Sequence, residues 1–395
     1  MNIYRPGINQ LCHVYTRVLN RSYKVLAIES SCDDACITLL DRYSRSKPPC
    51  LVDELKDTLD STNSGGVIPA EAAKHNSRSI SELASKAIVK NGWNTEATKP
   101  DLVCATRGPG MMSSLAAGYQ LGMGLSIAWQ IPIVGVNHML GHLMMARMSS
   151  NGKYPSYPFL SLLASGGHTI CVLSRSLLDH EILVDTVDIA AGDALDKCGR
   201  ELGFHGNMIG KEMDRFLRKY PEEQGKTPLL EICEPMKNQG HRKNVLKYSF
   251  ASFISQVRRS IFKHYNGITP SDSKTIARMA YQVEEAIFQH MITKIKLAIK
   301  EKNLFIDNFV CSGGVASNLM LRKMLEDQLR PLDIVNFYYP DPQHCTDNAT
   351  MIGWAGIELF EHGLTTDLST AVIRKWPIDS ILDLYGWHRK AKVND

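Results

Sequence analysis

The amino-acid sequence contains two histidines in an otherwise apolar stretch. His138 and His142 lie four positions apart within VNHMLGHLMM, residues 136–145. On a helix this spacing puts both imidazoles on one face, close enough to hold one metal ion. No acid stands between them, so the pair lacks the glutamate that activates water in HExxH metallopeptidases. Two core histidines without a ligand would show the same spacing, and both interpretations remain open on this motif alone.

An aspartate near the C-terminus is a candidate third ligand. Asp347 follows the residues His-Cys-Thr and precedes an apolar helical pattern. In this position an aspartate either caps the helix or ligates a metal ion. Two imidazoles and one carboxylate that leave coordination positions open suit Fe(II) or Zn.

Further carboxylates lie at the predicted ends of strands and helices. Asp196, which precedes Lys197, either hydrogen-bonds a ribose or belongs to a solvated ion pair on a helix surface. The sequence does not decide between these two roles. The other carboxylates of this kind are Asp33, Asp34, Asp188 and Asp193.

Glycine turns stand at four predicted strand ends. Glycine allows a positive φ and a close approach of the backbone to a ligand, and a following helix offers free N–H groups to a phosphate. One such turn is expected in any protein, but four at strand ends favour a nucleotide site. The turns are Gly65-Gly66, Gly108-Pro109-Gly110, Gly166-Gly167 and Gly313-Gly314.

The predicted elements repeat one plan in the two halves of the chain. Each half opens with two strands joined by a polar turn and continues with a strand, a glycine turn and a helix. The repeat predicts an α/β protein with two lobes of the actin and hexokinase type. Residues 43–64 are polar, and residues 205–260 are polar and hard to assign. Predicted strands cover 24–31, 35–41, 101–106, 133–136, 159–164, 168–173, 181–187, 308–312 and 334–339, and predicted helices cover 70–91, 112–130, 190–202, 273–302, 316–329 and 347–361.

Composition narrows the class of protein. With 395 residues and 44% hydrophobic content, the chain can bury the cores of two domains. No apolar run approaches the roughly 20 residues of a membrane span, so no membrane association is expected. The formal charge of +4 permits an anionic partner such as RNA without requiring one. The ten cysteines form no CxxC pair, which predicts buried, reduced thiols and neither a zinc ribbon nor a disulfide scaffold.

The N-terminal segment has the composition of a mitochondrial presequence. It contains no acid before Glu29, whereas Arg5, Arg17, Arg21 and Lys24 are basic. An N-terminal extension without a targeting role has the same composition. We expect residues 1–23 to be presequence-like.

Eight motifs in order resemble one family, the tRNA threonylcarbamoyladenosine transferases, formerly described as O-sialoglycoprotein endopeptidases. The resemblance covers roughly residues 24–365 and, with the presequence-like start, points to the mitochondrial member. The motifs are IESSCDDA (28–35), GGVIP (65–69), RGPG (107–110), NHMLGH (137–142), SGGHT (165–169), AGDALDK (191–197), SGGVASN (312–318) and CTDNA (345–349).

The resemblance implies a fold and an activity. The fold is the two-lobed actin-like ATPase (ASKHA) fold, with duplicated ribonuclease-H-like lobes and a cleft between them. The activity is transfer of the threonylcarbamoyl group from threonylcarbamoyl-AMP, made by a separate synthase, to N6 of adenosine 37 in mitochondrial tRNAs reading ANN codons, with release of AMP. A homodimer in the mitochondrial matrix is implied. The implied lobes cover residues 24–153 and 154–345, the second with an insertion at about 205–260, and residues 346–395 return as a helix to the cleft and the first lobe before a tail.

The same resemblance assigns roles to individual residues. His138, His142 and Asp347 match the ligands of one divalent metal ion per subunit, Fe or Zn, and Asp33 matches a catalytic carboxylate. The positions that match contacts to the nucleotide part of the substrate are Leu163, Ala164, Ser165, Gly166, Gly167, Asp196, Gly210, Asp214 and Asn318. Basic residues in 211–263, with Arg389, Lys390 and Lys392, are candidate contacts to tRNA phosphates.

Four departures and three rival functions accompany this assignment. The chain has SCDDA where the family has SCDET, Ile170 where it has Gln, Asp193 where it has Glu, and no Pro-Gly-Gly run in 205–215. A kinase or ATPase of the same fold would explain the glycine turns but leave the histidine pair without a role. A metallopeptidase would explain the histidines but not the missing glutamate, and a non-catalytic scaffold would tolerate loss of His138.

Overall fold

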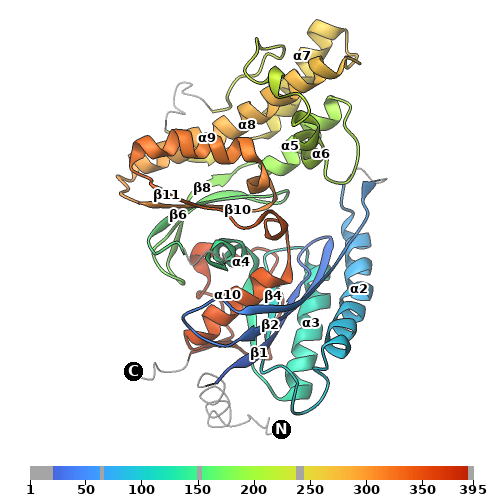
Figure 1. Ribbon diagram of the computed structural model, residues 1–395, viewed down its shortest axis with the longest axis vertical. Coiled ribbons are helices and arrows are strands. Elements are labelled where there is room, and N and C mark those ends of the chain that lie inside the picture. Colours follow the sequence, from blue (N-terminus) through green and yellow to red (C-terminus); the bar gives the residue numbers. More distant parts are fainter. Residues whose placement is uncertain (1–20, 63–65, 149–153, 237–243, 390–395) are drawn as a thin grey trace. The chain divides into compact units, whose positions relative to one another are not determined.

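The computed structural model describes residues 21–62, 66–148, 154–236 and 244–389 (Figure 1). Nearly all of the presequence-like segment, Gly65 of the first glycine pair, and Lys390 and Lys392 lie outside the described residues. The described chain divides into two compact units. Unit 1 comprises the chain up to Tyr154, Leu177–His180 and the chain from Asp347, and unit 2 comprises Pro155–Ser176 and Glu181–Thr346.

Unit 1 contains a five-stranded sheet in the order β3-β2-β1-β4-β5. The first three strands are antiparallel, and β1, β4 and β5 are parallel to one another. The central strands read as continuous apolar runs because helices cover both of their faces. The strands are β1 (Tyr23–Glu29), β2 (Asp34–Arg42), β3 (Cys50–Thr58), β4 (Leu102–Gly108) and β5 (Ile133–Asn137).

Two pairs of helices cover this sheet. Helices α2 (Pro69–Lys90) and α3 (Met112–Trp129) pack on one apolar core with β1, β2 and β4. Helix α10 (Ala349–Glu361), from the end of the chain, packs on the sheet with α4 (His138–Met145) (Figure 1). It approaches β4 so closely that a Cβ on Gly356 would lie 2.3 Å from Cys104 Sγ. The C-terminal segment is therefore a core element of unit 1.

Unit 2 repeats the strand order of unit 1. Its sheet runs β11-β10-β6-β7-β8-β9, so β8-β7-β6-β10-β11 corresponds to β3-β2-β1-β4-β5. Here also the second strand is antiparallel to the first, and β10 is parallel to β6 and β11. The duplicated plan expected from the sequence is confirmed, with β9 added at one edge. The strands are β6 (Phe159–Ala164), β7 (Thr169–Ser174), β8 (His180–Thr186), β9 (Lys247–Tyr248), β10 (Asn308–Ser312) and β11 (Asn336–Tyr338).

Five helices of unit 2 pack on one extended apolar core. The longest, α8, is buried over much of its length, and α5, α6, α7 and α9 contact it (Figure 1). They are α5 (Ala191–Glu201), α6 (Ile209–Leu217), α7 (Ala251–Tyr265), α8 (Ser273–Glu301) and α9 (Leu319–Leu329).

Several elements were not expected from the sequence. Strand β3 lies in the polar segment 43–64, α6 and β9 lie in 205–260, and α7 begins there and ends at Tyr265. A small sheet pairs β12 (Leu364–Thr366) with β13 (Trp387–Arg389). In the part of the chain that the structure describes, no helix has the length and apolar character needed to cross a bilayer.

Candidate metal centre and substrate-binding residues

The histidine pair begins a helix whose start is fixed by a neighbouring asparagine. Helix α4 follows β5 directly, and Asn137 Oδ1 accepts hydrogen bonds from the backbone N–H groups of Met139 and Leu140. Both imidazoles are buried, and their rings meet edge to face with centroids 4.8 Å apart. The helical spacing expected from the sequence is confirmed.

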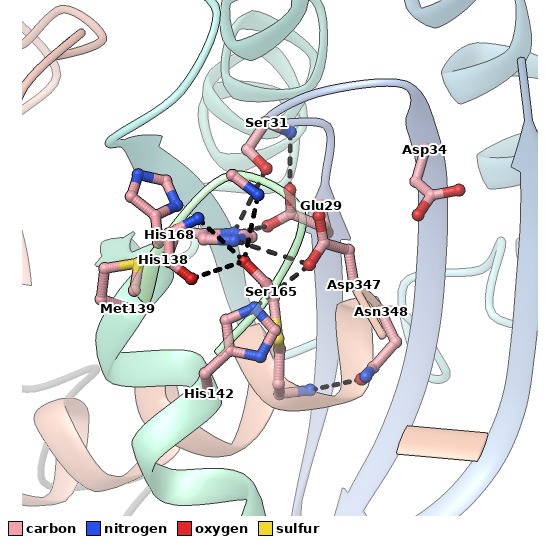
Figure 2. Close-up of polar contacts among 12 residues, drawn as sticks. Glu29, Ser31, Asp34, His138, Met139, His142, Ser165, His168, Asp347 and Asn348 are labelled. Carbon is pink, nitrogen blue, oxygen red and sulfur yellow. Dashed lines mark hydrogen bonds and ion pairs between the residues drawn. The ribbon is translucent and has the colours of Figure 1, made fainter. Parts of the chain in front are cut away.

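Asp347 lies beside both histidines (Figure 2). Its Oδ1 is 3.1 Å from His142 Nε2 and 3.6 Å from His138 Nε2. The cap of α10 is the next residue, Asn348, whose Oδ1 accepts from the backbone N–H of Met351. Asp347 is therefore not the cap of α10, and its carboxylate faces the histidines instead of the helix.

The three side chains have the spacing of a metal site. Their ligand atoms lie within 4.8 Å of one another, and no other such cluster occurs among the described residues. With bonds of about 2.0–2.1 Å, tetrahedral ligand atoms stand about 3.3 Å apart. The distances of 3.1 and 3.6 Å from Asp347 Oδ1 lie on either side of this value. The nitrogen and oxygen donors fit a divalent transition metal ion.

The electrostatics of the cluster favour a positive charge. Burial by itself lowers the pKa of His138, but the carboxylates of Glu29 and Asp347 together raise it to about 9. Burial likewise opposes the charged form of Asp347, yet His138, His142 and Lys56 hold its pKa well below its usual range. In the absence of an ion, protonated imidazole supplies the positive charge. A bound cation would compensate the negative charge of the same carboxylates.

Glu29 belongs to this cluster although sequence reasoning did not select it. It ends β1 with no exposed surface, and its Oε2 lies 3.2 Å from His138 Nδ1. The available signal was an acid at the end of the apolar run KVLAIE, because a buried carboxylate needs a partner.

The two adjacent aspartates of the polar turn have different surroundings. Asp33 is partly exposed, and with burial it raises the pKa of the Cys32 thiol. Asp34 is buried and pairs with Lys56 Nζ at 2.7 Å. Burial raises the pKa of Asp34 to about 6 although Lys56 acts in the opposite direction. Asp34 is thus held by structural contacts, and Asp33 is the more accessible carboxylate.

The RGPG turn packs against the protein's own C-terminal segment. A Cβ on Gly108 would lie 2.1 Å from the carbonyl oxygen of Ile373, and the Ile373 N–H donates to Arg107 O at 2.7 Å. The guanidinium carbon of Arg107 lies 5.7 Å from the ring centroids of both Trp376 and Tyr385. The glycine here serves a backbone-to-backbone contact, which corrects the expectation of a phosphate loop at this turn.

The turn at Ser165–Gly167 differs from the RGPG turn. It follows Leu163 and Ala164, which end β6. Ser165 Oγ accepts from the N–H groups of Gly167 and His168, at 3.3 and 3.1 Å, and so shapes the turn (Figure 2). Cβ atoms on Gly166 and Gly167 would meet nothing within 4 Å. No neighbouring atom therefore fills the space beside these two glycines.

The other four predicted substrate contacts form two pairs in unit 2. Asp196 Oδ1 accepts from the Gly210 N–H at 2.6 Å, which joins α5 to the start of α6. Asp214, on α6, lies 3.4 Å from Asn318 Nδ2, and Asn318 caps α9. Lys197 pairs with Asp193 instead of Asp196, so Asp196 is not the solvated ion pair that the sequence left open.

A buried glutamate supports the Asn318 amide. Glu284, on α8, accepts from Asn318 Nδ2 at 3.0 Å and is 1% exposed. Burial is the main cause that raises the pKa of Glu284 to about 8, with Asp214 adding to it. Sequence reasoning missed this residue because it lies within an ordinary amphipathic helical pattern.

Solved structures establish the fold. A crystal structure of HypF from T. kodakarensis superimposes with a TM-score of 0.53 at 13% identity, covering 86% of this chain and 48% of that one. A second HypF structure, in the phosphate- and nucleotide-bound form, gives a TM-score of 0.50 at 13% identity and covers 86% of this chain and 56% of that chain. This chain spans about half the length of these proteins. With the duplicated strand order, the protein has the actin-like ATPase (ASKHA) fold.

Sequence comparison identifies the family. Residues 53–354 match the tRNA N6-adenosine threonylcarbamoyltransferases. A curated relative from Schizosaccharomyces pombe (strain 972 / ATCC 24843), named tRNA N6-adenosine threonylcarbamoyltransferase, mitochondrial, is 36% identical over 385 residues, which cover 94% of this chain and 90% of the relative. The chain belongs to the tRNA N6-adenosine threonylcarbamoyltransferase family. It is a mitochondrial member, as the motifs together with the presequence-like start implied.

Proposed function

We propose that this protein is a metal-dependent tRNA N6-adenosine threonylcarbamoyltransferase of the mitochondrial matrix. It transfers the threonylcarbamoyl group from threonylcarbamoyl-AMP to N6 of adenosine 37 in mitochondrial tRNAs that read ANN codons, and AMP is released. The observation that carries the proposal is the cluster of two buried histidines, His138 and His142, with the partly exposed Asp347, in a member of this family. A kinase or ATPase of the same fold would leave this cluster without a role.

The reaction requires no covalent enzyme intermediate. The N6 amine attacks the carbamoyl carbon, a C–N bond forms, and the bond from that carbon to the phosphate oxygen breaks. AMP leaves with the bonding electron pair, and the amine loses a proton. Because a carbonic–phosphoric anhydride is already activated, the protein mainly has to position the two substrates and stabilise developing charge.

Asp33 is the proposed acceptor of the amine proton. It is partly exposed in the turn between β1 and β2, whereas its neighbour Asp34 is paired with Lys56. An exposed carboxylate can approach the nucleophile, and a buried ion-paired one cannot.

His138, His142 and Asp347 would hold one Fe or Zn ion. When bound, the ion supplies Lewis-acid polarisation of a substrate oxygen. The two imidazoles are buried, and the partly exposed carboxylate of Asp347 faces both of them.

The AMP part of the substrate is proposed to bind residues of unit 2. Gly166 and Gly167 offer open space for a phosphate or ribose, and the Asp196–Gly210 and Asp214–Asn318 pairs supply polar groups on rigid helices. The remaining contacts of this set are Leu163, Ala164 and Ser165, which end β6 and shape the turn.

Transfer by the purified full-length chain tests the proposal. Threonylcarbamoyl-AMP and a mitochondrial tRNA transcript are supplied, and modified adenosine is measured in wild type, His138→Ala, Asp347→Asn and the control His264→Ala, whose histidine pairs with Glu231 at the surface. We expect roughly a 100-fold or larger loss in the first two variants, since a Lewis acid supplies several kcal/mol. Wild-type rates in both variants would show that the cluster has no part in the reaction.

The oligomeric state and the partners are tested by the same preparation. We propose a homodimer that works without accessory subunits on threonylcarbamoyl-AMP made by a separate synthase. Light scattering should give twice the mass of the chain, and transfer should proceed with no other protein added. A monomer with full activity would remove the homodimer from the proposal.

A further inference from the structure

The two histidines of the metal cluster are held differently. His138 Nδ1 lies 3.2 Å from Glu29 Oε2 and 3.2 Å from Ser31 Oγ (Figure 2). His142 Nδ1 is buried and has no hydrogen-bond partner among the described residues. Both histidines turn Nε2 to Asp347. Only His138 therefore has its ring fixed from the side opposite the ligand atom.

Glu29 is itself held firmly. The Ser31 backbone N–H donates to Oε1 at 2.6 Å, and the Thr106 hydroxyl donates to Oε2. The carboxylate lies at the end of β1 with no exposed surface, and Thr106 lies on the neighbouring strand β4. Two strands of the central sheet thus fix the position of the oxygen that faces the imidazole.

We propose that Glu29 is the positioning residue of the metal centre. It accepts the Nδ1–H of His138, which selects the tautomer with a free Nε2 lone pair and orients that lone pair toward the ion. A carboxylate behind a ligating imidazole also increases the basicity of the ligand nitrogen. The inference rests on the proposed metal site, and it assigns a role to a residue that does not contact the ion.

Glutamine at position 29 distinguishes positioning from packing. Glutamine has nearly the same shape as glutamate, so Glu29→Gln keeps the packing at the end of β1. The Ser31 N–H needs an acceptor, so the glutamine oxygen takes the place of Glu29 Oε1. The amide NH₂ then takes the place of Oε2 and faces His138 Nδ1. Nδ1 then becomes an acceptor, and the proton moves to Nε2, the ligand atom. A packing role tolerates this substitution, whereas a positioning role does not.

The experiment measures zinc affinity of the full-length chain by competition with a chromophoric chelator. We expect Glu29→Gln to weaken zinc binding about 10- to 100-fold. The matched control is Glu361→Gln, which alters another largely buried carboxylate of unit 1, bound to Arg42 and Tyr23. That control should bind zinc within about threefold of wild type, because Glu361 contacts neither histidine.

A spectroscopic readout accompanies the affinities. In the zinc-loaded wild type, long-range ¹H–¹⁵N correlations should show His138 with a proton on Nδ1 and Nε2 bound to zinc. If Glu29→Gln fails to fold, the measurement on the wild type tests the proposal by itself. Zinc bound to Nδ1 of His138 would overturn the proposal, and a protonated Nδ1 would support it. Zinc binding by folded Glu29→Gln within threefold of wild type also overturns it. Failure of the wild type to bind any divalent metal ion would instead reject the metal site itself.

Discussion

Lys56 joins Asp34 to the backbone of Asp347. Its Nζ lies 2.7 Å from Asp34 Oδ2 and 2.9 Å from the carbonyl oxygen of Asp347. Lys56 comes from the edge strand β3, and Asp347 immediately precedes the cap of α10. A single ammonium group therefore holds the start of α10, with the aspartate that faces the histidines, against the first three strands.

Lys56→Met should destabilise the protein. The substitution leaves Asp34 buried without its cation, which we expect to cost about 1–3 kcal/mol in the free energy of unfolding. The control Lys90→Met breaks an exposed pair with Asp53 and should cost under about 0.5 kcal/mol. Urea unfolding measures both. Equal effects of the two variants would show that Lys56 forms only an ordinary surface ion pair.

Asp196→Ala should weaken binding of AMP. The Asp196 carboxylate accepts from the Gly210 N–H and holds the start of α6, the helix that carries Asp214. Loss of this acceptor should raise the dissociation constant for AMP about tenfold, because one partly buried hydrogen bond to a charged group is lost. Asp193→Ala on the same helix should have little effect, because its partner Lys197 is at the surface. Calorimetric titration of AMP measures the difference.

Glu284 should make stability fall as the pH rises. Its pKa is about 8 in the folded protein, above the ordinary glutamate value of 4.5, so the folded state retains a proton that the unfolded state has released. The stabilisation is complete below about pH 4.5 and is lost as the pH approaches 8. Between pH 5 and 8 the loss from this group is about 3 kcal/mol. Glu284→Gln should remove this slope in urea unfolding, and exposed Glu285→Gln should keep it.

Arg107 should fix the C-terminal segment to the sheet of unit 1. Its guanidinium donates to the carbonyl oxygens of Ala371 and Tyr385 and contacts the aromatic rings of Trp376 and Tyr385. Arg107→Ala should lower the free energy of unfolding by about 2–4 kcal/mol and increase hydrogen exchange in residues 371–386. Arg78→Ala, at an exposed helix position, is the control. Unchanged exchange in 371–386 would refute this role.

The central parts of both sheets could be predicted from the sequence because burial leaves a strong pattern. Strands β1 and β4 are covered on both faces and read as continuous apolar runs. Strand β3 could not be predicted in the same way. It is an edge strand that carries Asp53, Glu54, Lys56 and Asp57, and charge on an edge strand looks like a loop in a single sequence.

The candidate ligands were visible in the sequence, but their supporting contacts were not. His138 and His142 share a helical turn, so their spacing alone brings them together. The contact of Glu29 with His138 joins positions 109 residues apart, and that of Lys56 with Asp347 joins positions 291 apart. Only the folded sheet creates such pairs. For the same reason the sequence could not distinguish Gly108, whose turn packs against Ile373, from Gly166, where a Cβ would meet nothing within 4 Å.

The position of α10 in unit 1 has a consequence for biosynthesis. The imidazole of His142 and the carboxylate of Asp347 are 205 positions apart, and the whole of unit 2 is translated between them, together with the short unit 1 segment Leu177–His180. A nascent chain therefore displays both histidines long before it can complete their donor set. We therefore expect metal loading to be a post-translational step. Chains arrested before residue 347 should lack α10 on the sheet of unit 1 and should bind no ion.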